Sequence, residues 1–166
     1  MLSALRFLLV LSALPLTNLA DAQQVVFLVR HAERDANGGD ALTPEGRDRA
    51  AALADGLRNA GMTVVVRSDT ERTKATAAPT LKASHAIEKV VGVGTSHVKE
   101  AYDAIRAASA NSVVLYVGHS DTIGPLMNRL GHRGEVALGH DDYGNLFVLV
   151  PKDSEPTVLR LRFGGK

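Results

Sequence analysis

The sequence contains no cysteine, which excludes disulfide frameworks, thiolate catalysis and zinc ribbons. It also has no excess of charge of one sign, because 19 Lys and Arg stand against 18 Asp and Glu, a formal net charge of +1. A nearly neutral protein has no overall field that attracts nucleic acid or an anionic membrane surface. We therefore expect no nucleic-acid partner, and any recognition of an anion must come from a local cluster of charges.

Internal repeats, linkers and low-complexity stretches are absent as well. The composition is 45% hydrophobic and 22% charged, close to the roughly 45–50% and 25% of ordinary globular domains. A chain of 166 residues fits one domain. These properties predict a single globular domain with one active site.

The first 22 residues have the pattern of a secretory signal peptide. Arg6 precedes an apolar run over 7–16, and the small-residue triplet Ala-Asp-Ala follows at 20–22. About ten apolar residues are too few to cross the bilayer core, which needs about twenty. The sequence thus predicts cleavage after Ala22, a mature domain over 23–166, and export to the periplasm or the medium without a stable membrane anchor. Retention of the segment as an anchor is the alternative.

The rest of the chain alternates strand and helix patterns. Thr43 and Pro44 supply an N-cap hydroxyl and a first-turn proline for the first helix, and Gly61 is placed to end it. The expected helices cover 44–61, 71–85, 97–108 and 122–130. The expected strands cover 25–29, 62–66, 90–93, 112–117 and a terminal hairpin of 146–150 and 157–162. This alternation predicts an α/β fold, a three-layer α/β/α sandwich around a mostly parallel sheet with an antiparallel edge strand.

Polar and charged residues follow three of the predicted strands at the point where each ends. They are Arg30-His31, the segment Ser68–Arg72, and Gly118-His119. In open α/β sheets, ligands bind at the carboxyl edge of the strands. Two arginines and two histidines meeting there would form a positive pocket, and the planar fork of Arg suits phosphate oxygens. The sequence therefore predicts a pocket for a phosphate monoester.

These residues resemble the motifs of the histidine phosphatase superfamily, the phosphoglycerate mutase-like proteins. Arg30-His31-Ala32 is similar to the family's Arg-His-Gly signature, with alanine at the third position. The resemblance continues in the same order through Leu42–Gly46, Ser68–Thr73 with Thr76–Pro79, and Gly118–Ser120. Together the four blocks cover most of the mature chain. The resemblance implies a phosphoglycerate mutase-like fold and a small single-domain phosphatase.

The resemblance also implies a mechanism that uses no metal and no organic cofactor. His31 would attack phosphorus in line, Arg30, Arg72 and His119 would hold the phosphoryl oxygens, and water would hydrolyse the phosphohistidine. The attacking nitrogen of His31 must then be unprotonated. We expect a backbone carbonyl or a side chain to hold the other ring nitrogen. The substrate would be a phosphorylated small molecule or a phosphoprotein.

The general acid stays open at this point. Many members place a Glu after the second helix, where this chain has only Glu88, without the family's surrounding motif. Another branch places an Asp directly after its second histidine, whereas here Ser120 intervenes. Asp121 and Glu33 are therefore competing candidates for the acid. Each has an alternative interpretation, Asp121 as a helix cap and Glu33 as a solvent-exposed partner of Arg34.

Other functions compete with the phosphatase. The segment 118–122, Gly-His-Ser-Asp-Thr, nearly matches the nucleophile elbow Gly-x-Ser-x-Gly of serine hydrolases, but Thr122 stands where glycine is required. A non-catalytic module of the same fold that binds a phosphorylated ligand is a further alternative. A mutase is disfavoured, because the compact chain lacks insertions to exclude water from a phosphoenzyme.

The four other histidines of the sequence are scattered. They lack the close spacing of a metal cluster, so we predict no metal site and interpret them as structural or surface residues. They are His85, His97, His132 and His140.

Overall fold

The computed structural model describes residues 24–35 and 39–164. The predicted signal peptide, residues 1–22, lies outside the described residues. Within the described ranges, no helix is both long enough and apolar enough to cross a membrane.

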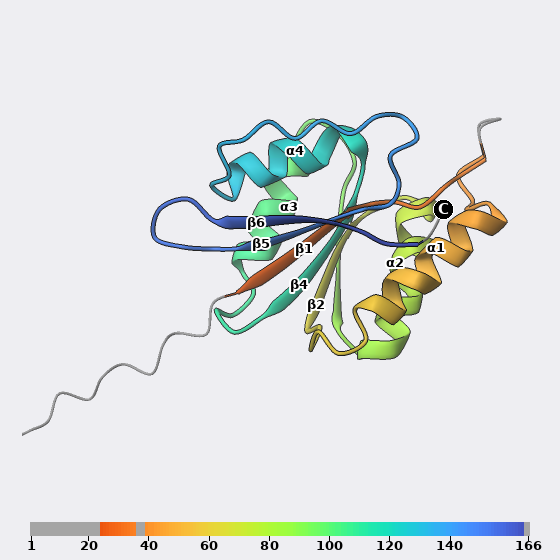
Figure 1. Cartoon of the computed structure of the whole chain (residues 1–166), viewed down its shortest axis with the longest axis horizontal. Coiled ribbons are helices and arrows are strands. Elements are labelled where there is room, and N and C mark those ends of the chain that lie inside the picture. The colour runs from red at the N-terminus through yellow and green to blue at the C-terminus, as the bar shows by residue number, and fades with distance from the viewer. Residues whose placement is uncertain (1–23, 36–38, 165–166) are drawn as a thin grey trace, which may run out of the picture.

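One sheet of six strands forms the centre of the molecule, with the strand order β3-β2-β4-β1-β5-β6 (Figure 1). The strands are β1 (Val25–Arg30), β2 (Val64–Ser68), β3 (Ile87–Val91), β4 (Val113–Gly118), β5 (Asn145–Val150) and β6 (Thr157–Arg162). The first four are parallel, whereas β5 runs antiparallel to β1 and pairs with β6 as a hairpin. The predicted mostly parallel sheet with an antiparallel hairpin at one edge is confirmed.

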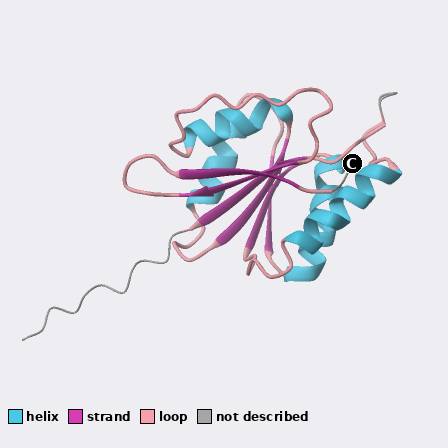
Figure 2. Cartoon of the chain, in the orientation of Figure 1, coloured by secondary structure: helices cyan, strands magenta, loops and turns pink. Residues whose placement is uncertain are grey.

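Helices cover both faces of this sheet, as Figure 2 shows. They are α1 (Pro44–Gly56), α2 (Glu71–Ser84), α3 (His97–Arg106) and α4 (Ser120–Arg129). Leu53 of α1 and Ala77 of α2 pack with one face of the sheet, and Ile105 of α3 and Leu126 of α4 pack with the other. The three-layer α/β/α sandwich is therefore confirmed, and its cores are built from the periodic apolar residues of each helix.

Strand boundaries differ from the prediction on the outer side of the sheet. β2 extends through Arg67 and Ser68, which the sequence placed in a loop, because the charge of buried Arg67 is paired with Glu88 on β3. β3 begins at Ile87 rather than at residue 90. Its first four residues are exposed and include two charged side chains, as suits an edge strand, so the apolar pattern that marks buried strands is missing.

Helix ends also differ from the prediction. α1 ends at Gly56, because Leu57 packs into the core and caps the helix. Gly61 has a φ of +69° and belongs to the turn that follows, not to the helix end. α4 begins at Ser120, two residues earlier than expected, since the Thr122 hydroxyl accepts a hydrogen bond from the backbone N–H of His119 at 2.9 Å.

The topology brings the predicted motifs together. β1, β4 and β2 are adjacent and parallel, so their carboxyl ends meet at one edge. Arg30 pairs with Gly118 in the register of β1 and β4, and the His31 N–H donates to the Gly118 carbonyl at 2.8 Å. The two histidine motifs, which lie far apart in sequence, therefore lie side by side in the fold.

Candidate active site

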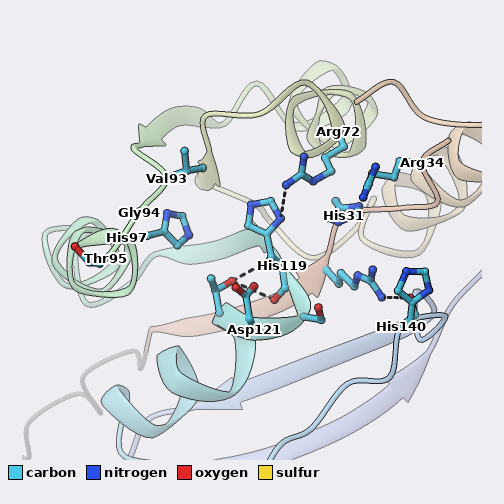
Figure 3. Close-up of a pocket in the computed structure, with 13 residues that line it drawn as sticks. His31, Arg34, Arg72, Val93, Gly94, Thr95, His97, His119, Asp121 and His140 are labelled. Atoms are coloured by element: carbon cyan, nitrogen blue, oxygen red, sulfur yellow. Dashed lines mark hydrogen bonds between the residues drawn. The ribbon is translucent and has the colours of Figure 1, made fainter. Parts of the chain in front are cut away.

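A cavity of about 780 Å³ opens at the carboxyl edge of β1, β2 and β4 (Figure 3). It is strongly basic, since three arginines line it and Asp121 is its one lining carboxylate among the described residues. The lining residues are Arg30, His31, Arg34, Arg72, Val93, Gly94, Thr95, His97, His119, Ser120, Asp121, Thr122 and His140. The cavity thus contains the two arginines and two histidines that the sequence placed together.

The hydrogen bonding of His31 within the described residues leaves one of its ring nitrogens free. Its Nδ1 lies 2.8 Å from the Ala32 carbonyl oxygen, which can only accept, so Nδ1 carries the proton and Nε2 keeps its lone pair. This contact confirms the expected backbone carbonyl. Burial lowers the pKa of His31 to about 3 against the raising effect of that hydrogen bond, and the charges of Arg30 and Arg72 lower it further. The imidazole is therefore neutral in the ordinary pH range.

His119 lies beside His31, with the two ring centroids 5.4 Å apart. Its Nε2 lies 2.8 Å from the Ser68 hydroxyl, and its Nδ1 lies 3.3 Å from Nη2 of Arg72. An arginine only donates, so Nδ1 accepts and Nε2 carries the proton. Burial, followed by the charge of Arg72, lowers the pKa of His119 to about 4.

Arg72 is held at the cavity by Asp40. The Asp40 carboxylate pairs with Nη1 of Arg72, and its second oxygen accepts from the Glu71 backbone N–H at 2.7 Å, at the start of α2. Burial alone would raise the pKa of Asp40, but the hydrogen bonds from Arg72 and Glu71 lower it below its ordinary value. Asp40 thus fixes the orientation of the guanidinium.

Arg30 is anchored from the loop between α4 and β5. Its Nη1 donates to the backbone carbonyls of Gly139 and His140, and its guanidinium lies 4.1 Å from the centroid of the Tyr143 ring. Within the described part of the chain, the buried Nε atoms of Arg30 and Arg72 have no hydrogen-bond partner. Buried donors without a partner are uncommon and call for an acceptor. Both donors belong to residues that line the cavity beside His31.

Two further sequence blocks support the loop that follows β1. The Thr76 hydroxyl accepts from the Ala32 N–H at 2.9 Å. A Cβ at Gly46 would collide with the Glu33 carbonyl oxygen, so only glycine allows α1 to approach this loop. The motifs at 42–46 and 76–79 therefore shape the backbone around the nucleophile without contacting a ligand themselves.

Comparison with known proteins agrees with this geometry. The sequence profile of the histidine phosphatase superfamily (branch 1) matches residues 26–92, which contain Arg30, His31 and Arg72. A structure from Nakamurella multipartitia, assigned as the phosphohistidine phosphatase SixA, is 25% identical, covers 86% of this chain and 97% of its own, and has a TM-score of 0.66. The family profile and this structural neighbour both support the histidine phosphatase superfamily. A search of the curated proteins finds no significant match.

More distant structures share the phosphoglycerate mutase-like fold. A structure assigned as an α-ribazole-5′-phosphate phosphatase of Escherichia coli is 16% identical, covers 84% of this chain and 96% of its own, and has a TM-score of 0.66. The mycobacterial glucosyl-3-phosphoglycerate phosphatase is 14% identical, covers 86% and 99%, and has a TM-score of 0.60. These similarities support the fold rather than a particular substrate.

The three candidates for the general acid differ in whether they line the cavity. Asp121, in the first turn of α4, is exposed and lines the cavity. Glu33 is outside this cavity and pairs with Arg49, not with Arg34 as the alternative interpretation had it, at 2.6 Å between Glu33 Oε1 and Arg49 Nη2. Glu88 is paired with Arg67 on β2. Only Asp121 among these three carboxylates can reach a ligand in the cavity.

The structure gives Ser120 no support as a nucleophile. Ser120 lines the cavity, but no imidazole of the described residues hydrogen-bonds its hydroxyl. A serine nucleophile needs an adjacent general base. Nor does any group of three or more His, Asp or Glu side chains in the described ranges have the arrangement of a metal site.

Several residues in the cavity or beside it were missed by sequence reasoning. Arg34 and His140 line the cavity, and Tyr143 lies 5.9 Å from the His31 ring, centroid to centroid. His97, interpreted as structural or on the surface, is buried in the cavity wall. Asp40 was part of a loop without a motif. Residues 31–33 lie outside β1, so no strand alternation marked Arg34 as a cavity residue.

The low pKa values of His31 and His119 predict an acid-sensitive fold. Below pH 6.5 these two histidines become protonated in the unfolded chain but stay unprotonated in the native protein. The free energy of unfolding should therefore fall as the pH drops from 6.5 toward the folded pKa values of about 3 and 4. The loss should approach about 1.4 kcal/mol per pH unit for each histidine. Thermal melting between pH 4 and 7 measures it. His31→Asn should flatten the profile, whereas His85→Asn, at an exposed position, should leave it unchanged. Equal slopes in all three proteins would contradict the expectation.

Proposed function

We propose that the chain is a phosphatase that hydrolyses phosphate monoesters through a phosphohistidine on His31. The observation that carries the proposal is that neutral His31, with a free Nε2, lines the same cavity as Arg30 and Arg72, whose buried Nε atoms have no hydrogen-bond partner among the described residues. A phosphoryl group needs an in-line nucleophile and donors for its equatorial oxygens, and this arrangement supplies both.

The reaction would proceed in two displacements. In the first, the Nε2 lone pair of His31 forms the N–P bond while the bond from phosphorus to the leaving oxygen breaks, and Asp121 gives that oxygen a proton. In the second, Asp121 takes a proton from water, the water oxygen attacks phosphorus, and the N–P bond breaks. Arg30, Arg72 and His119 would hold the phosphoryl oxygens in both steps. His119 would then take up a proton, which the negative charge of the phosphoryl group favours.

The size of the cavity and the assigned activities of the structural relatives are the two observations that bear on the kind of phosphorylated substrate. The structural relatives include proteins assigned as phosphohistidine phosphatases and a phosphatase of a sugar-linked phosphoglycerate. The 780 Å³ cavity has room for a leaving group beside the phosphate. A small phosphorylated metabolite and a phosphorylated loop of a protein both fit this description.

Trapping the phosphoenzyme tests the proposal. Residues 23–166 are mixed with 4-nitrophenyl phosphate in the presence of a chelator, quenched in alkali within milliseconds to seconds, and analysed by peptide mass spectrometry. We expect chelator-resistant release of phosphate and an acid-labile phosphate on the peptide that contains His31. Phosphate binding by calorimetry without any release would instead favour the non-catalytic binding module. Modification of Ser120 rather than His31 would favour the serine hydrolase.

The role of Asp121 gives a second prediction. Asp121→Asn should lower kcat/KM for an alkyl phosphate by about 10²-fold, because a poor leaving group needs a proton in the transition state of the first displacement, and by far less for 4-nitrophenyl phosphate. Glu33→Gln is the matched control: it breaks the Arg49 ion pair and should lower the melting temperature more than kcat/KM. A larger fall in kcat/KM for Glu33→Gln than for Asp121→Asn, on the alkyl phosphate, would reverse the assignment.

A further inference from the structure

His97 is buried although it stands at the start of α3, with 3% of its surface exposed. Its ring centroid lies 6.1 Å from that of His119, on the side away from His31 in the view of Figure 3. Both ring nitrogens are engaged. Nδ1 lies 2.6 Å from the Gly92 carbonyl oxygen, to which it donates, and Nε2 lies 2.7 Å from the Tyr116 hydroxyl. Neither ring nitrogen of His97 is therefore free to bind a ligand.

The hydrogen bonds continue from His97 to the backbone of His119. The hydroxyl of fully buried Tyr116 also lies 2.9 Å from Thr122 Oγ1, within hydrogen-bond distance. Thr122 Oγ1 in turn accepts from the His119 N–H at 2.9 Å and donates to the His119 carbonyl at 3.1 Å. The chain of contacts thus begins at the loop before α3 and ends on the main chain of a phosphate-binding residue.

Gly118 shows how closely this chain is packed against the turn. A Cβ at Gly118 would collide with the hydroxyl and ring of Tyr116. The Tyr116 side chain therefore fills the space directly below the backbone that leads into His119. Glycine is required there so that the hydroxyl can reach Thr122.

We propose that Tyr116, Thr122 and His97 are positioning residues that hold His119 in the geometry needed for phosphoryl transfer. This inference rests on the proposed phosphatase function. His119 has one side-chain hydrogen bond to Ser68 and one to Arg72, and both demand a fixed backbone below the ring. A displacement of about 1 Å in a group that orients the reacting phosphoryl can lower the rate about 10²-fold. The network also ties His119 to residues 92–97, whose members Val93, Gly94 and Thr95 line the cavity wall.

The variants for the test are Tyr116→Phe, which removes only the hydroxyl, and Thr122→Val, which removes the acceptor for the His119 N–H. Thr122→Ser restores a hydroxyl and serves as the rescue. Tyr102→Phe is the matched control, because Tyr102 lies on α3, outside the cavity, with its ring 5.0 Å from the Arg129 guanidinium. Each variant is assayed with 4-nitrophenyl phosphate, and the binding of vanadate, a mimic of the phosphoryl-transfer transition state, is measured by calorimetry.

We expect Tyr116→Phe and Thr122→Val to lower kcat/KM about 10- to 50-fold and to weaken vanadate binding by a similar factor, with a smaller change for inorganic phosphate. Thr122→Ser should recover most of the vanadate affinity, and Tyr102→Phe should match the parent. A loss of rate with unchanged vanadate affinity would mean that less protein is folded, and it would overturn the positioning role. Unchanged rates would overturn it as well. A parent protein that neither turns over substrate nor binds vanadate would contradict the proposed function itself.

Discussion

Replacing His31 with alanine should lower phosphate release by at least about 10³-fold, to the limit of detection. In the proposed reaction this side chain supplies the attacking lone pair. The neighbouring side chains are poor substitutes, because both nitrogens of His97 and of His119 form hydrogen bonds within the protein and Ser120 lacks an imidazole base. Removing a covalent nucleophile therefore removes the reaction path and not merely one stabilising contact. The assay is release of 4-nitrophenol at pH 6 with a chelator present.

Two controls make this result specific. His85→Asn changes an exposed histidine in a left-handed conformation that asparagine tolerates, and it should retain the parent rate. Inorganic phosphate should still bind to His31→Ala, because Arg30 and Arg72 remain in the cavity. If the alanine variant retained more than a few per cent of the activity, His31 would not be the nucleophile.

Replacing Arg30 with glutamine should lower kcat/KM by about 10²- to 10³-fold. Loss of one preorganised donor to a developing oxyanion has this size in other enzymes, and arginines in phosphoryl transfer contribute at least as much. Arg30 also fixes the loop between α4 and β5, because its Nη1 donates hydrogen bonds to the Gly139 and His140 carbonyls. We therefore expect KM to rise together with the fall in kcat.

Lysine should not rescue this position. A lysine ammonium cannot bond the loop carbonyls and present a separate Nε–H to a phosphoryl oxygen at once, since it lacks the rigid fork of arginine. Arg58→Gln is the control, because Arg58 lies on the surface and pairs with Asp55, away from the cavity. An Arg30→Lys variant as active as the parent would show that only the charge matters.

The sequence was most informative where the chemistry is local to a strand end. Arg30 and His31 follow an unbroken apolar run, so the strand and its carboxyl edge were predictable, and with them the meeting of the motifs around His119. Arg67 illustrates the limit: a charge normally ends a buried strand, and only its ion pair with Glu88 on the neighbouring strand keeps it inside the sheet.

The candidate acids illustrate the same limit at the site. From the sequence, Asp121 and Glu33 were competing candidates, because both lie two residues from a motif histidine and the better loop position of Asp121 did not decide between them. What separates them is Arg49, sixteen residues from Glu33, whose guanidinium draws that carboxylate away from the cavity. A pairing of this kind depends on how α1 packs against the loop after β1.

The sequence by itself determined the α/β alternation, the order of the motifs and the edge of the sheet at which they gather, because apolar periodicity and strand-end placement are local properties of the chain. Tertiary structure alone decided the tautomer of His31, the clamp of Asp40 on Arg72 and the burial of His97 beneath the site. Each of these depends on a hydrogen-bond partner supplied by another part of the backbone, and the identity of such a partner is fixed only when the helices and the sheet have packed.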